Sequence, residues 1–78
     1  MVYPNPSDGK FSYMIPEKTD DNIVQTVEVY NTIGDVVFSQ QVNYTGQNIL
    51  DLGDVTTGIY IIKVISGEIV YSAKLMVE

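Results

Sequence analysis

The side chains that could do chemistry here are carboxylates, because the 78 residues contain no histidine and no cysteine. Ser–His and Cys–His nucleophile pairs are therefore excluded. Asp51 and Asp54 have the spacing of a conceivable carboxylate dyad, but both flank a predicted turn, where aspartate commonly bonds its own backbone. We interpret both as turn residues, so the sequence predicts no catalytic site and no enzyme.

Two further polar clusters have the composition of binding or modification sites. Asp20-Asp21-Asn22 supplies clustered oxygen ligands of the kind that calcium takes, although a lone acidic loop is usually only solvated. Asn43-Tyr44-Thr45 matches a glycosylation sequon, which has meaning only in a eukaryotic secretory route. We expect no metal and no cofactor, and a ligand-binding module that uses calcium at Asp20 and Asp21 is kept as one alternative function.

The charge of the chain restricts its partners. Ten carboxylates face four lysines, which gives a net charge of −6. Nucleic acid and anionic lipid both require a cationic surface, so we expect neither nucleic-acid binding nor direct membrane insertion. No stretch approaches the roughly 20 apolar residues of a membrane span. Residues 1–4 also lack the basic and apolar regions of a signal peptide.

The elements that must position any site are strands. β-Branched and aromatic residues recur in short runs between turn residues, and helical spacing is never sustained. This pattern indicates an antiparallel sandwich or barrel. Extended segments are predicted at residues 2–4, 10–15, 24–31, 35–42, 48–52, 58–66 and 68–77, with turns at 5–9, 33–35 and 66–68.

Alternation along each strand predicts which side chains face the core. Lys63 marks the solvated face of residues 58–66, which turns Tyr60, Ile62 and Val64 inward. Residues 36–38 are consecutive and apolar, so a bulge there could reset the phase of that strand. The same alternation predicts inward positions for Val27, Val29, Leu50, Leu52, Tyr71, Ala73, Leu75 and Val77.

The solvated face of residues 58–66 is itself apolar. Ile59, Ile61 and Ile65 share it with Lys63. Either a neighbouring strand or loop covers these isoleucines, or they form a contact patch. Because monomers rarely expose large apolar patches, we expect them to be covered.

The segment Leu52–Tyr60 resembles the corner of immunoglobulin-like sandwiches, in which a tyrosine at a strand start bonds to upstream backbone. We expect the Tyr60 hydroxyl to donate to backbone around residues 54–55, and Gly58 to let the chain bend beneath the ring. The predicted fold is therefore all-β, an immunoglobulin-like antiparallel β-sandwich of about seven short strands. It forms one domain over residues 1–78.

Several motifs, taken in order, resemble the type IX secretion C-terminal sorting domain. The resemblance covers nearly the whole chain, and the order and spacing of the motifs make it specific. The chain departs from the family in ending with Glu78 rather than a basic residue. The motifs are Tyr3-Pro4-Asn5-Pro6 with Gly9, Val27-Glu28-Val29-Tyr30-Asn31 with Gly34-Asp35-Val36-Val37, Leu50-Asp51-Leu52 with Gly58-Ile59-Tyr60, and Lys74-Leu75.

The resemblance implies a sorting signal at the end of a periplasmic cargo protein. Its partners would be the type IX translocon, sortase components and a covalently linked N-terminal cargo domain. The cargo would be in the periplasm in transit and then at the cell surface or secreted. The recognition candidates are the family's recurring positions, Pro4, Asn5, Pro6, Gly9, Gly34, Gly58, Tyr60, Lys74 and Leu75.

Two alternatives stay open at this point. A passive immunoglobulin-like spacer or adhesion module of a surface protein would share every structural prediction made above. Position in the parent gene separates the two functions, because a sorting signal must be the last domain. Lys74 also has a second interpretation, as an edge-strand lysine that discourages strand-to-strand aggregation.

Overall fold

The computed structural model describes residues 2–3, 8–15, 17, 22–42 and 46–78. Within these ranges no helix is long and apolar enough to cross a membrane. Six of the strands lie inside the predicted extended segments, and β5 begins two residues before its predicted start. The strands are β1 (Val2–Tyr3), β2 (Lys10–Ile15), β3 (Gln25–Asn31), β4 (Val36–Val42), β5 (Gly46–Asp51), β6 (Gly58–Ser66) and β7 (Ile69–Val77).

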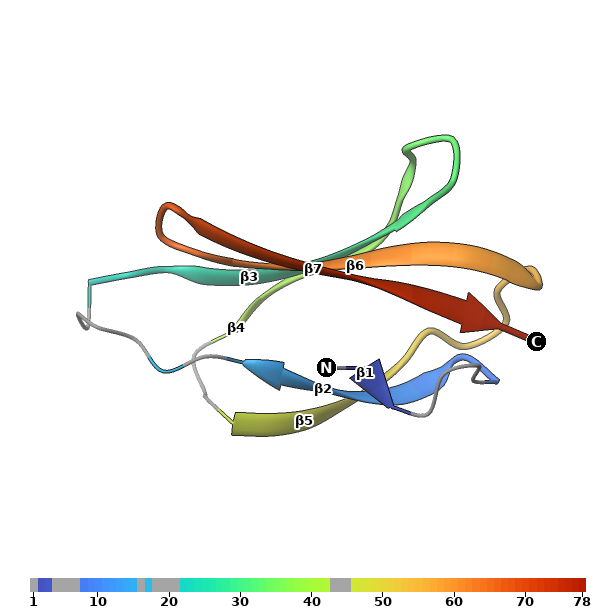
Figure 1. Ribbon diagram of the computed structural model, residues 1–78, viewed down its shortest axis with the longest axis horizontal. Helices are drawn as coiled ribbons and strands as arrows, with labels where there is room; N and C mark the ends of the chain where they lie inside the picture. Colours follow the sequence, from blue (N-terminus) through green and yellow to red (C-terminus); the bar gives the residue numbers. More distant parts are fainter. Residues whose placement is uncertain (1, 4–7, 16, 18–21, 43–45) are drawn as a thin grey trace.

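The strands form two antiparallel sheets that face each other (Figure 1). One sheet has the order β1-β2-β5 and the other β4-β3-β6-β7. In immunoglobulin lettering these orders are A-B-E and C′-C-F-G, so the described strands follow the immunoglobulin arrangement without a strand D. The predicted all-β antiparallel sandwich is confirmed.

The core lies between the two sheets and is built by the predicted alternation. Val27 and Val29 of β3 are completely buried. Ile62 and Val64 of β6 are only 3% and 5% exposed. The three-stranded sheet contributes buried side chains of its own, and each fully buried aliphatic or aromatic side chain contributes about 1.5–3 kcal/mol. The buried apolar residues are Phe11, Tyr13, Ile15, Val27, Val29, Val42, Leu50, Tyr60, Ile62, Val64, Leu75 and Val77.

The prediction that the Tyr71 side chain is buried in the core is wrong. Tyr71 is 48% exposed, although its pairing with Val64 places it on the inner face as the alternation predicts. Because β7 is the edge of a four-stranded sheet and the opposing sheet has three strands, little lies opposite this part of β7. Leu52 and Ala73, also predicted inward, are partly buried and pack against the core.

The bulge anticipated within residues 36–38 is present. Val29 pairs with Phe38 and Tyr30 with Val36, so β4 carries one extra residue, Val37, opposite β3. The bulge sends Phe38 toward the core, where it is partly buried, and leaves Val36 on the outer side. A consecutive apolar run is thereby accommodated without two adjacent residues entering the core.

The hairpin between β3 and β4 is closed by Asn31. Its side-chain Oδ1 accepts hydrogen bonds from the backbone N–H groups of Ile33 and Asp35, at 3.2 and 2.9 Å. Gly34 has φ +93°, a left-handed conformation that favours glycine, as predicted for this turn. Asn31 and Gly34 together therefore fix how this hairpin leaves the sheet.

The end of the four-stranded sheet opposite this hairpin contains a buried polar pair that the sequence pattern did not reveal. Gln25 is completely buried, and its Nε2 donates to Ser66 Oγ at 3.1 Å. The two residues are register partners in neighbouring strands. The hydrogen bond satisfies the Gln25 amide nitrogen and the Ser66 hydroxyl, whose burial would otherwise be costly.

Residues 52–57 cross from the three-stranded sheet to β6, and Tyr60 holds them. The Tyr60 hydroxyl donates to the backbone carbonyl of Thr56 at 2.5 Å, while the residue is 5% exposed. The predicted corner is therefore present, but its acceptor lies one residue after the expected range of 54–55. A single side chain thus joins the core to the crossing loop.

Burial and hydrogen bonding at this corner predict two different losses of stability. Tyr60→Phe keeps the buried ring and removes one hydrogen bond, so it should lower the free energy of unfolding by about 0.5–1.5 kcal/mol. Leu75→Ala opens a cavity at a position with no exposure and should cost about 2–5 kcal/mol. Denaturant melts of both variants measure this order. A larger loss from Tyr60→Phe would contradict the assignment of Tyr60 as a corner residue.

Candidate functional site

The recognition candidates that the structure describes gather at one end of the sandwich. Pro4, Asn5 and Pro6 lie outside the described residues. The other six come from separate parts of the chain. Pairing of β3, β6 and β7 brings five of them to the end where β6 begins and β7 ends, and a backbone hydrogen bond with Leu52 joins Gly9 to it. We call this the corner end and define it by residues 8–9, 31–35, 52–60 and 74–77.

Gly9 joins the start of the chain to the corner end. Its carbonyl oxygen accepts a hydrogen bond from the Leu52 backbone N–H at 2.8 Å. Its φ is +106°, and an added Cβ would come within 3.3 Å of the Gly53 carbonyl oxygen. A side chain at this position would therefore meet both backbone strain and a close contact, which explains the glycine.

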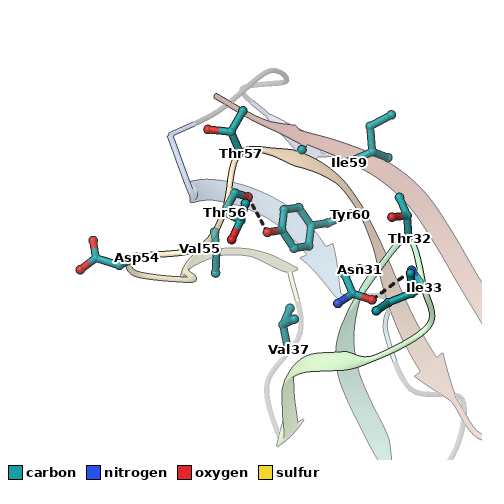
Figure 2. Close-up of a pocket in the computed structure, with 11 residues that line it drawn as sticks. Asn31, Thr32, Ile33, Val37, Asp54, Val55, Thr56, Thr57, Ile59 and Tyr60 are labelled. Carbon is teal, nitrogen blue, oxygen red and sulfur yellow. Dashed lines mark hydrogen bonds between the residues drawn. The ribbon is translucent and has the colours of Figure 1, made fainter.

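Asp51 takes part in the same turn. Its Oδ1 accepts a hydrogen bond from the Gly53 backbone N–H at 2.8 Å, so the interpretation of Asp51 as a turn residue is confirmed. Asp54 is exposed and points away from the centre of the corner in Figure 2. The Asp51 carboxylate is therefore used in the turn, as the sequence pattern predicts.

A hollow of about 440 Å³ lies between the crossing loop and the β3–β4 hairpin (Figure 2). Tyr60 lies at its centre, where its hydroxyl donates to Thr56, and Asn31 lies beside it on the neighbouring strand. Its lining combines threonine hydroxyls with isoleucine and valine side chains, a mixture suited to contacts with a polypeptide. The lining residues are Asn31, Thr32, Ile33, Val37, Asp54, Val55, Thr56, Thr57, Gly58, Ile59 and Tyr60.

A second hollow, of about 450 Å³, lies on the other side of residues 31–32. It opens on the outer side of the four-stranded sheet, next to the β3–β4 hairpin that projects away from the three-stranded sheet (Figure 1). We call it the outer hollow. Its lining residues are Tyr30, Asn31, Thr32, Gly34, Ile61 and Lys63.

Three side chains in and beside the outer hollow interact. The Tyr30 hydroxyl donates to Glu28 Oε1 at 2.7 Å, and the Lys63 ammonium lies 4.9 Å from the Tyr30 ring centroid. The hydrogen bond to Glu28, followed by desolvation and the charge of the carboxylate, raises the pKa of the Tyr30 phenol. Tyr30 therefore stays neutral over the physiological pH range, and its ring holds the Lys63 cation in place.

The structure separates the two residues of the Lys74-Leu75 motif. Leu75 is completely buried and pairs with Tyr60, so it can act only through the fold. Lys74 is exposed on the outer side of β7, in register with Ile61 beside the outer hollow. Because β7 is an edge strand, the position of Lys74 fits both interpretations. Lys74 can be a recognition residue, or it can be an edge guard, a lysine that discourages aggregation through the exposed strand edge.

The isoleucines of β6 that were expected to be covered lack a covering layer in the described part of the chain. Ile61 and Ile65 are half-buried by the strands on either side, and Ile59 is 38% exposed. The expectation of a covering element is therefore wrong for Ile59, because β6 lies inside the sheet but that sheet is the outermost layer. The outward side chains of β3, β4, β6 and β7 form one surface, which we call the outer face.

Sequence reasoning did not select Lys63 and Tyr30 as site residues. Tyr30 lies within the motif of residues 27–31, and Lys63 is a cation within an otherwise apolar strand. Their proximity depends on the pairing of β3 with β6, in which Glu28 is opposite Lys63 and Tyr30 opposite Ile61. A local sequence pattern does not contain this cross-strand pairing. The presence of a lysine in an otherwise apolar strand was the one feature of the sequence that could have pointed to Lys63.

Comparison with known proteins places the chain in a family. A family described as secretion system C-terminal sorting domain matches residues 1–78. The chain is also 33% identical, over 99% of its length, to a protein named ulvan lyase NLR42 from Nonlabens ulvanivorans. It spans only 14% of that protein's length. The chain belongs to the secretion system C-terminal sorting domains, the type IX family that its ordered motifs resemble.

Proposed function

We propose that this domain is a sorting signal that directs a covalently linked cargo protein through the type IX translocon of the outer membrane. The observation that carries the proposal is the family match over residues 1–78, the whole of the described sandwich. The cargo crosses the periplasm before export. After export a sortase removes the domain, and the cargo is attached to the cell surface or released.

The length relation to the relative supports a separate cargo. The chain spans 14% of the ulvan lyase, so most of that protein lies outside the match. A lyase activity then belongs to the cargo and the sorting signal performs no chemistry. At the corner end, a hydrogen-bonded tyrosine and glycine turns hold a fixed shape in place of a catalytic group.

The corner end is where we propose that recognition takes place. Gly9, Gly34 and Gly58 shape the turns there, and Tyr60 and Leu75 hold the strands beneath them. Among the described candidates, Lys74 is the one charged side chain exposed to a partner. We therefore expect the glycines, Tyr60 and Leu75 to act by shape, and Lys74 to act by direct contact.

Export of a reporter tests the function. A fluorescent cargo with a signal peptide, the native upstream linker and residues 1–78 at its C-terminus should reach the surface or medium of a host with a type IX translocon. Deleting the translocon should retain the cargo in the periplasm. Fractionated immunoblots measure both. Equal export without the translocon, or none with it, would favour the passive spacer instead.

Lys74→Glu tests the one exposed charged candidate. A surface substitution of this kind should change stability by no more than about ±0.5 kcal/mol. We expect the variant to melt like the wild type but to export less cargo, with material accumulating in the periplasm. Lys10→Glu makes the same charge change on the three-stranded sheet and serves as the control. Wild-type export of Lys74→Glu at an unchanged melting temperature would reduce Lys74 to an edge guard.

A further inference from the structure

We infer that the outer face docks an acidic segment of the export machinery that also carries apolar side chains, with the outer hollow at the centre of the contact. The inference rests on the proposed function, because it takes the partner to belong to the translocon. It goes further because it assigns the surface of the domain that the translocon contacts and the chemical character of the contacting segment.

The charge of the outer face is opposite to that of the domain. The whole chain has a net charge of −6. Among the described outward residues of its four strands, Lys63 and Lys74 are cationic and Glu28 alone is anionic. Glu28 keeps its charge beside Lys63, its register partner, so these outward strand residues have a net charge of +1 (two lysines against one glutamate). An acidic partner is therefore attracted to this face and repelled by most of the remaining surface.

Apolar side chains surround these lysines. Val36, Val70 and Met76 are 51%, 54% and 38% exposed, and each lies on an outward position of the sheet. Ile59 is 38% exposed beside Met76, its register partner. Exposed apolar side chains that gather on one surface mark interaction sites in soluble proteins. The partner segment must therefore bring apolar side chains as well as carboxylates.

The centre of the face is arranged before binding. Lys63 lies in an interior strand, and its ammonium is held at 4.9 Å from the Tyr30 ring centroid. The outer hollow next to it, about 450 Å³, has room for side chains of a partner. Because a pre-positioned side chain loses less conformational freedom on binding, such a site gains affinity.

Other occupants fit this face less well. A second copy related by two-fold symmetry would bring lysines of one copy close to lysines of the other. A flat membrane surface offers no side chains to enter the outer hollow. A cargo domain joins the chain before β1, which pairs into the three-stranded sheet on the opposite side of the sandwich. A partner protein of opposite charge is the remaining class.

Matched substitutions on the two sheets test the inference in the export assay. Ile61→Thr and Lys63→Gln change the outer hollow, whereas Ile49→Thr and Lys10→Gln make the same changes on the outward side of the three-stranded sheet. Each outer-face variant should reduce the exported fraction about five- to ten-fold, as truncation of a central contact residue does. The two control variants should export like the wild type. Melts of each purified domain establish that the variants fold, and Lys63→Gln remains informative if Ile61→Thr melts early.

The outcomes separate the inference from the function. If the wild type is not exported through the translocon, the proposed function fails. If the wild type is exported and folded Lys63→Gln exports equally well, the function stands and the inference is overturned. Equal losses in the two controls would overturn it too.

Two measurements on the isolated domain test the other occupants. Sedimentation that shows a wild-type dimer dissociated by Ile61→Thr would assign the face to a second copy. Binding to phosphatidylserine vesicles that Lys63→Gln abolishes would assign it to a membrane. Either result would overturn the inference. A domain that is monomeric and does not bind the vesicles supports it.

Discussion

The two-residue period of β6 is the constraint on which the rest of the molecule depends. Every second residue of this interior strand must enter the core, because two thin sheets without disulfides have little else to hold them together. Ile62 and Val64 do so. The same period places Ile61 and Lys63 on the opposite side, where they border the outer hollow. Stability and the proposed recognition therefore share one strand, on different faces.

The corner end shows how a fold without catalytic groups keeps a constant shape. Tyr60 anchors the crossing loop through its hydroxyl, Asn31 closes the neighbouring hairpin through its side chain, and Gly9 lets the first turn approach Gly53. The first two contacts fix the crossing loop and the hairpin locally, the third joins the first turn to the crossing loop, and strand pairing brings these parts together at one end of the sandwich. A signal read by shape requires such a fixed arrangement.

Sequence patterns predicted the strands, the inward faces and the corner, because each follows from spacing within a few residues. The bulge at Val37 was anticipated for the same reason, from a run of three apolar residues. The prediction that Tyr71 is buried was wrong, because the exposure of this side chain depends on the width of the opposing sheet. The Gln25–Ser66 pair and the Tyr30–Lys63 contact depend on cross-strand register, which no single segment contains.

Site-specific photocrosslinking in living cells can identify the surface of the domain that the translocon contacts. Ser72 lies on the outer face opposite Lys63, and Gln47 lies on the outward side of the three-stranded sheet; both are exposed. A photoreactive amino acid at position 72 should form an adduct with a translocon component, and the same probe at position 47 should not. The adduct should disappear when the translocon is deleted. An equal adduct from position 47, or none from position 72 in cells that export the cargo, would contradict the account.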